Sequence, residues 1–344
     1  MKIINYDAFN ATNYFTIFEC DLDDKRRLLD YMLWLIESDA NLKILTDTKF
    51  APSGEWVKWL SGNFLAFSEN KIMFKSGHKL YGSYNPSFIP AYYNLKLIKL
   101  FKLVYVNLQR WFSLDRNSPI KSESAFSEFY PKHSFGIKHE DFMGVHPGPY
   151  FRILEPNVLM GDVNRDVLLE IGAGAGINPM FNFVNYGSTS IIIDLPETIS
   201  MAFALIKTFI PTALIALPND IDKEIKLGKS LETIIDSYDF IFLLPTQVSL
   251  LSENIVDVAF NMASFQEMDI SVVRNYVSLI HKVLKPGGHV ALLNLEISRQ
   301  IPNNSMDKYG LECFEKGDFI TAKFANWQIS KLKGLKYICY IGSK

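Results

Sequence analysis

One stretch, Val167-Leu-Leu-Glu-Ile-Gly-Ala-Gly-Ala-Gly-Ile177, is the most informative part of this sequence. It begins as an apolar run of the kind that forms a buried strand, and it then places glycine at positions 172, 174 and 176. Glycine lets the backbone turn tightly and approach a ligand closely, where any Cβ atom would collide. Because open α/β sheets bind ligands at the carboxyl ends of their strands, the stretch predicts a ligand-binding loop.

From residue 166 onward, short apolar runs alternate with helical segments. Continuous apolar strands that alternate with helices indicate a parallel sheet covered on both faces. We therefore predict an α/β fold with a doubly wound, mostly parallel, seven-stranded sheet of the Rossmann-like kind. The expected strands are residues 167–171, 189–194, 239–244, 256–261 and 289–294, with a final antiparallel pair at 321–329 and 336–341; the expected helices include 196–209 and 270–284.

The N-terminal part of the chain has a different pattern, with helical periodicity and irregular connecting segments. Apolar residues recur at helical spacing over residues 22–42, a helix start follows Pro52, and residues 95–114 form an apolar helical stretch that carries lysines. We expect a mainly helical N-terminal region over residues 1–155, which would bind the acceptor or cover the site, and a second domain over residues 156–344.

Composition and charge exclude several classes of protein. The formal net charge of −2 argues against a nucleic-acid partner, which usually needs a basic face. The sequence contains no uninterrupted apolar run of the kind that would predict a signal peptide or a membrane span. The 3 cysteines are far apart and predict neither a disulfide framework nor a zinc site, which fits a cytoplasmic protein. The sequence leaves the oligomeric state open, and a homo-oligomer is compatible with it.

Two carboxylates near the glycines indicate the chemistry of the ligand. Asp194 ends the second expected strand, 18 residues after Gly176, where it can accept hydrogen bonds from both ribose hydroxyls of a nucleoside or cap the helix that follows. Glu170 precedes the first glycine, where it suits a ligand with ammonium and sulfonium groups better than a pyrophosphate. The spacing Gly-x-Gly-x-Gly also differs from the dinucleotide spacing Gly-x-Gly-x-x-Gly. The pattern therefore favours S-adenosylmethionine (SAM).

Taken together, Glu170, the three glycines and Asp194 resemble class I SAM-dependent methyltransferases over about residues 150–344. A narrower resemblance is to a sugar O-methyltransferase family associated with bacterial surface glycans and secondary metabolites. It is carried by Ile193-Asp-Leu-Pro-Glu197, Leu244-Pro-Thr-Gln247, Asn261-Met-Ala-Ser-Phe-Gln-Glu-Met268 and, in the N-terminal region, Ser53-Gly-Glu-Trp56.

The resemblance implies a set of cofactor contacts. Pro245, Thr246 and Gln247 would lie beside the adenine edge, and Asn261 would lie beside the methionine part and the methyl group, although Thr246 and Gln247 also suit an ordinary polar loop. Tyr150 would close over the cofactor. The full set of expected SAM-binding residues is Glu170, Gly172, Gly174, Gly176, Asp194, Leu195, Thr246, Gln247, Asn261 and Tyr150.

Methylation of a hydroxyl benefits from a general base, because a protonated hydroxyl is a poor nucleophile. Glu267 is the first candidate, since it follows the fourth expected strand, although it also suits the start of the next helix. His139 and His146 are further candidates, because a loop that precedes the glycine stretch carries both. We expect no metal site, since no pair of aspartates follows the fourth strand.

The expected function is therefore SAM-dependent O-methylation of a sugar or glycan precursor, by an enzyme that binds a small-molecule or glycan acceptor. Three alternatives remain open: O-methylation of a non-sugar metabolite, a nicotinamide-dependent oxidoreductase, and a non-catalytic subunit with the SAM-binding fold. The oxidoreductase explains the sheet and Asp194 but leaves Glu170 and the glycine spacing without a role. A non-catalytic subunit has no need of the intact glycines and carboxylates.

Overall fold

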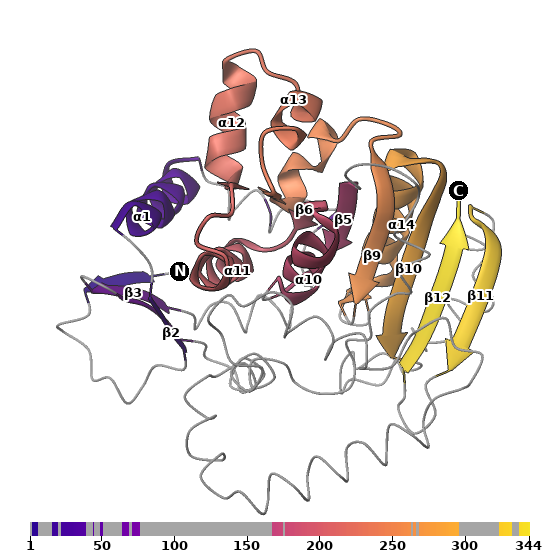
Figure 1. Cartoon of the computed structure of the whole chain (residues 1–344), viewed down its shortest axis with the longest axis horizontal. Coiled ribbons are helices and arrows are strands. Elements are labelled where there is room, and N and C mark those ends of the chain that lie inside the picture. The colour runs from indigo at the N-terminus through magenta and orange to yellow at the C-terminus, as the bar shows by residue number, and fades with distance from the viewer. Residues whose placement is uncertain are drawn as a thin grey trace, which may run out of the picture.

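A computed structural model describes most of the C-terminal half of the chain and several segments of the N-terminal half (Figure 1). The described residues are 2–5, 16–19, 22–38, 44, 49–50, 64–68, 71–75, 167–174, 176–262, 264–265, 268–295, 323–331 and 337–344.

The larger sheet has 8 strands in the order β11-β12-β10-β9-β5-β6-β8-β7. From β7 through to β10 all neighbours are parallel, whereas β12 pairs antiparallel with both β10 and β11. The strands are β5 Val167–Ile171, β6 Thr189–Ile193, β7 Ile215–Ala216, β8 Phe240–Leu243, β9 Val256–Met262, β10 Leu284–Leu295, β11 Ala325–Lys331 and β12 Tyr337–Ser343. The fold is therefore a doubly wound, mostly parallel sheet, as predicted, and the two-residue β7 adds an edge strand to the seven expected ones.

The strand order reverses beside β5. The chain places β6, β7 and β8 on one side of β5, with β8 inserted between β6 and the edge strand β7, and it then returns to place β9 on the other side of β5. Ligands bind in open α/β sheets at such a switch point, outside the carboxyl ends of the strands. The glycine stretch leaves β5 at this position.

Helices connect the strands. They are α10 Ile177–Tyr186, α11 Pro196–Phe209, α12 Pro218–Lys226, α13 Leu231–Ile235, the 3₁₀ helix η3 Pro245–Leu250 and α14 Ile270–Val283. Prolines begin α11, α12 and η3, since proline fits the first turn of a helix, where its missing N–H is not needed. The expected helices at 196–209 and 270–284 are confirmed to within one residue.

Both faces of the sheet are buried, and the side chains alternate between them. On β8, Phe240 and Phe242 pack towards α11 and α1, whereas Ile241 and Leu243 pack towards α13 and α14. Ile192 of β6 belongs to the first of these cores. Strands buried on both faces are apolar at every position, which is why these runs could be recognised in the sequence.

In the N-terminal region, the helix expected at residues 22–42 is present as α1 Leu22–Glu37, beside α11 and α12 in Figure 1. Its buried residues join the core over α11, and the buried pair Asp24–Lys207 and the pair Arg27–Asp220 hold it there with N–O distances of 3.5 and 2.7 Å. A four-stranded sheet, which the sequence reading did not anticipate, accompanies it in the order β1-β3-β4-β2. Its strands are β1 Lys2–Asn5, β2 Thr16–Glu19, β3 Phe64–Ser68 and β4 Lys71–Lys75. The helices expected after Pro52 and at 95–114 lie outside the described residues.

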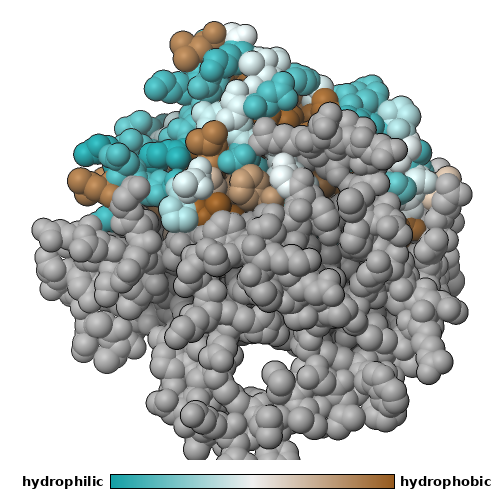
Figure 2. Space-filling view, in the orientation of Figure 1, coloured by the Kyte–Doolittle hydropathy of each residue, from teal (hydrophilic) through white to brown (hydrophobic). Residues whose placement is uncertain are grey.

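The described surface in Figure 2 is mainly hydrophilic, with scattered apolar residues. Leu33 and Ile36 of α1 are exposed apolar residues. Among the described helices, none has the length and apolar character needed to cross a lipid bilayer.

Candidate functional site

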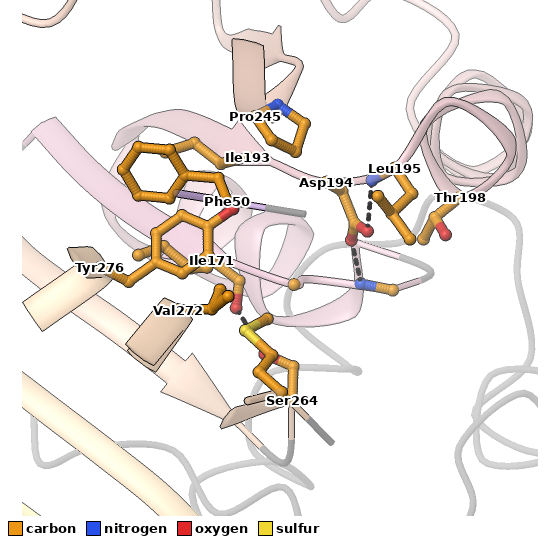
Figure 3. Close-up of a pocket in the computed structure, with 13 residues that line it drawn as sticks. Phe50, Ile171, Ile193, Asp194, Leu195, Thr198, Pro245, Ser264, Val272 and Tyr276 are labelled. Carbon is orange, nitrogen blue, oxygen red and sulfur yellow. Dashed lines mark hydrogen bonds between the residues drawn. The ribbon is translucent and has the colours of Figure 1, made fainter. Parts of the chain in front are cut away.

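A pocket with about 580 Å³ of empty space, open to solvent, lies at the switch point of the sheet (Figure 3). The ends of β5 and β6, the starts of α11 and η3, the segment after β9 and one face of α14 all contribute to it. The lining residues are Phe50, Ile171, Gly172, Gly174, Ile193, Asp194, Leu195, Thr198, Pro245, Ser264, Met268, Val272 and Tyr276.

The three glycines after β5 all have positive φ angles, but the space around them differs. At Gly172 an added Cβ would lie 2.3 Å from the Oγ of Ser264, so the next loop packs directly against this backbone. At Gly174 an added Cβ would meet no atom within 4 Å, which leaves this part of the turn open to a ligand. Gly176 begins α10 in the left-handed conformation and packs against Ala202 and Ile206 of α11. The turn is thus fixed at both ends and accessible in the middle.

Asp194 ties the glycine turn to β6. Its Oδ2 accepts a hydrogen bond from the N–H of Gly174 at 2.9 Å, and its Oδ1 accepts one from the N–H of Leu195 at 2.7 Å. Thr198 also donates a hydrogen bond to this carboxylate. Burial is the largest influence on the carboxyl and raises its pKa to about 7, although the three hydrogen bonds act in the opposite direction. The carboxylate therefore lies on the pocket wall with both oxygens held in fixed directions.

Glu170 lies beneath the turn rather than on the pocket wall. Its side chain is 3% exposed, and its Oε2 accepts a hydrogen bond from Asn178 Nδ2 at 3.2 Å. Asn178 is in the first helical turn of α10, and its backbone carbonyl accepts a hydrogen bond from Asn182 Nδ2 at 2.9 Å. Burial raises the pKa of Glu170 to about 8, and the nearby charge of Asp194 acts in the same direction. Two neighbouring buried carboxyls thus give the base of the site a negative potential once they ionise.

These raised pKa values predict how stability depends on pH. In the unfolded chain Glu170 ionises near its ordinary pKa of 4.5, whereas in the folded protein it keeps its proton up to about pH 8. Between these values the folded state binds a proton that the unfolded chain has released, so stability is greatest below the lower value and falls as pH rises. We expect the free energy of unfolding without ligand, measured in urea, to decrease from pH 5 to pH 8.

A matched pair of variants tests whether Glu170 causes this dependence of the free energy of unfolding on pH. Glu170→Gln keeps an acceptor for Asn178 but has no proton to lose, so it should reduce the pH dependence and leave the part that comes from Asp194. Glu253→Gln, which changes an exposed carboxylate, should leave the slope as it is. An unchanged slope in the Glu170 variant would show that burial of this group does not control stability.

Asn261 is the last residue but one of β9, is completely buried and is not among the residues that line the pocket. Its Nδ2 donates to the carbonyl of Ile171 at 2.8 Å and to Ser264 Oγ, while its Oδ1 accepts from the N–H of Phe265 at 3.2 Å and from Asn294 Nδ2 at 3.0 Å. Ser264 does reach the pocket. Asn261 therefore positions the loop after β9, and Ser264 is the side chain it presents.

In the segment after β8, too, one residue lines the pocket and its neighbours do not. Pro245 lines the pocket, but Thr246 and Gln247 are not among the lining residues. Gln247 uses its side chain internally, since Oε1 accepts from the N–H of Leu244 and Nε2 donates to the carbonyl of Pro218, both at 3.0 Å. In this structure Gln247 thus holds η3 against α12.

Of the ten expected SAM-binding residues, Gly172, Gly174, Asp194 and Leu195 line the pocket together. Glu170, Gly176, Asn261 and Gln247 surround these residues, and Thr246 lies in the loop after β8. Tyr150 and the three expected base candidates, Glu267, His139 and His146, lie outside the described residues. Among the described residues, no group of three or more His, Cys, Asp or Glu side chains is arranged to hold a metal ion.

Several lining residues were absent from the sequence prediction. Ser264 belongs to the stretch that carries the narrower resemblance and follows Asn261 by three positions, so its position was a usable signal. Thr198 faces Asp194 from the first turn of α11, a placement that helical geometry makes available. Phe50 gives no such signal, because the N-terminal region reaches the pocket only through tertiary contacts.

No protein-family model matches this sequence, and no curated protein matches it. Solved structures show partial likeness. A phosphoethanolamine N-methyltransferase from Haemonchus contortus, bound to phosphomonomethylethanolamine and S-adenosylhomocysteine, is 11% identical with a TM-score of 0.36, over 54% of this chain and 51% of that one. A SAM-dependent methyltransferase from Aquifex aeolicus is 17% identical with a TM-score of 0.31, over 52% of this chain and 81% of that one.

A family 2 O-methyltransferase from Planctomyces limnophilus, in complex with apigenin, is 15% identical with a TM-score of 0.34, over 52% of this chain and 50% of that one. This chain thus spans about half the length of the first and third of these proteins. In each of the three comparisons, about half of this chain takes part in the superposition.

Proposed function

We propose that this chain is a SAM-dependent methyltransferase that methylates a hydroxyl group of a sugar or glycan precursor. The observation that carries the proposal is the position of Asp194 at the end of β6, on the wall of the pocket beside the open glycine turn. An acidic residue in this position of a doubly wound sheet accepts hydrogen bonds from the ribose hydroxyls of a nucleoside.

The residues of the pocket suit SAM. The open space at Gly174 lets a ligand approach the backbone of the turn, and Asp194 offers its carboxylate to the ribose. Glu170 lies below the turn and keeps its proton up to about pH 8 without ligand, and a bound sulfonium would favour its ionised form, so that the two charges would stabilise each other. A dinucleotide has the opposite charge at its pyrophosphate, so the two carboxyls disfavour the oxidoreductase alternative.

When bound, SAM supplies a methyl group that its sulfonium has already activated. The chain has to hold the donor and the acceptor in line and exclude water. Asp194 and Thr198 fix one end of the site, and Asn261 fixes the loop that carries Ser264. Both contacts are local, since each joins the carboxyl end of a strand to the segment that follows it.

Glu267 remains our proposed general base. Two residues that flank it in the sequence, Ser264 and Met268, both line the pocket. A carboxylate there would accept the proton of the acceptor hydroxyl as the methyl group is transferred. His139 and His146 are the alternative bases if the N-terminal region covers this side of the pocket.

A hydroxyl of a sugar is proposed as the acceptor because three stretches that resemble the sugar O-methyltransferase family lie at the carboxyl ends of parallel strands of the same sheet. Ile193-Asp-Leu-Pro-Glu197 follows β6, Leu244-Pro-Thr-Gln247 follows β8, and the stretch that begins at Asn261 ends β9. All three strands run in the same direction, so the three stretches lie at one edge of the sheet.

Label transfer tests this proposal. The protein is incubated with methyl-labelled SAM and a cell extract that is then separated into nucleotide-sugar, glycolipid, protein and nucleic-acid fractions. We expect base-stable label in a carbohydrate fraction, and a Glu267→Gln variant should transfer at least about 100-fold less, the range typical of a lost general base. Label found only in protein or nucleic acid would contradict the sugar acceptor, and label in a small non-sugar metabolite would favour that alternative.

A further inference from the structure

The pocket has two chemically different ends. Asp194 and Thr198 lie at one end, and the other is walled by apolar side chains from Ile193, Pro245 and Val272 together with two aromatic rings (Figure 3). The two rings belong to Phe50 and Tyr276 and are in contact with each other.

Phe50 comes from the N-terminal region, more than a hundred positions before the glycine turn in the sequence. Its ring centroid lies 4.7 Å from that of Tyr276, with an angle of 51° between the planes. Tyr276 is 3% exposed and also stacks on Phe265 at 6.1 Å, so its own position is fixed by the core. Phe50 is only partly buried and is the more accessible ring of the pair.

The backbone next to Phe50 is held in place independently of the rings. Asn275 Nδ2 of α14 donates to the carbonyl of Lys49 at 2.9 Å. This hydrogen bond and the ring contact attach the Lys49–Phe50 segment to α14 at the pocket. The N-terminal region therefore supplies part of the pocket wall, rather than only covering it from a distance.

An aromatic wall beside a carboxylate matches a nucleoside, whose flat base is apolar on its faces and whose ribose is polar. Stacking of a base on an aromatic side chain contributes to binding without requiring a particular hydrogen-bond pattern. We propose that Phe50, supported by Tyr276, binds the adenine ring of the nucleoside ligand, so that the cofactor site is completed by a residue of the N-terminal region. This inference rests on the proposed function.

The first experiment compares S-adenosylhomocysteine with S-ribosylhomocysteine, which has the same ribose and amino acid but lacks the adenine. Titration calorimetry gives the dissociation constants for the wild type, Phe50→Ala and Phe50→Leu, at one pH and salt concentration. We expect Phe50→Ala to bind S-adenosylhomocysteine about 10- to 100-fold more weakly, the range for a lost base-stacking contact. Its affinity for S-ribosylhomocysteine should stay within about 2-fold of the wild type, because that ligand has no base to stack.

Two further variants separate stacking from attachment of the segment. Asn275→Ala removes the hydrogen bond to Lys49 but keeps the ring, so it should weaken S-adenosylhomocysteine binding by about 2- to 10-fold. Leu33→Ala changes an apolar residue on the exposed side of α1 and should bind like the wild type. In Phe50→Trp, saturating S-adenosylhomocysteine should quench fluorescence by more than it does in the wild type, since the new indole would stack on the base.

The outcomes distinguish this inference from the proposed function. Wild-type affinity in Phe50→Ala, or equal weakening for both ligands, would contradict the binding of adenine by Phe50 and would leave the proposed methyltransferase function in place. If the wild type bound neither SAM nor S-adenosylhomocysteine, the proposed function would fail and this inference with it. Selective weakening for the adenine-containing ligand supports the aromatic wall.

Discussion

Gly172→Ala is expected to abolish SAM binding and to destabilise the fold. The new Cβ would lie 2.3 Å from Oγ and 2.5 Å from Cβ of Ser264, whose hydroxyl is held by Asn261 and by the carbonyl of Ile171 at 3.0 Å. Ser264 cannot move aside without breaking these bonds. The φ angle of +70° adds backbone strain for any residue with a Cβ. Overpacking costs about 1–3 kcal/mol and a left-handed alanine about 1–2 kcal/mol, so we expect a loss of about 2–5 kcal/mol in urea unfolding.

Gly187→Ala is the matched control for this prediction. Gly187 has a similar φ of +68°, but an added Cβ there meets no atom within 4 Å, and the residue follows α10 away from the pocket. The Gly187→Ala variant should therefore lose only as much stability as the strained φ angle costs, and it should keep its affinity for SAM. If Gly172→Ala were no more destabilised than Gly187→Ala and still bound SAM, the close packing of the loop after β9 against the glycine turn would be wrong.

Asp194 is expected to tolerate neither alanine nor asparagine. Each carboxylate oxygen accepts from a different backbone N–H, those of Gly174 and Leu195, so an asparagine must turn its NH₂ group towards one of these donors. An unpaired buried donor costs about 1–3 kcal/mol. Both variants would also lose the proposed contacts to the ribose, and we expect SAM affinity to fall by about 10- to 100-fold in each, measured by titration calorimetry.

Asp194→Glu provides the contrast, because it keeps the charge but displaces it by one methylene. It should retain more of the affinity than asparagine if charge dominates, and no more than asparagine if the position of the two oxygens dominates. The geometry at Gly174 and Leu195 predicts the second result. Wild-type affinity in Asp194→Asn would contradict the assignment of this residue to the ribose.

Most of the larger sheet could be predicted from the sequence, because its strands are buried on both faces and therefore read as short apolar runs. Ile191, Ile192 and Ile193 illustrate this, since consecutive isoleucines pack into opposite cores and none is exposed. The two-residue β7 is too short to give such a signal. The strands of the N-terminal region were missed for two different reasons. β1 pairs parallel with β3 although the chain between them contains α1, and pairing over that distance leaves no local pattern. β3 and β4 pair antiparallel across two residues, and their apolar runs were a local hairpin signal that the sequence prediction overlooked.

The candidate site could be predicted where a residue's role follows from its place at the end of a strand. Asp194 ends β6 and lies on the pocket for that reason. Asn261 and Gln247 also follow their strands, but their amides are used by neighbouring backbone groups, and the sequence does not show which acceptor a flexible amide finds. The burial of Glu170 and its pKa of about 8 depend on the packing of α10 above it.

Direct binding tests the central claim, that the pocket at the end of β5 and β6 is a SAM site. Titration calorimetry of the wild-type protein at pH 8 would compare SAM, S-adenosylhomocysteine and NAD. We predict that SAM and S-adenosylhomocysteine each bind at one site per chain and that Asp194→Asn weakens both, while NAD shows no binding. Binding of NAD instead of SAM, or SAM binding that is unaffected by Asp194→Asn, would contradict the assignment.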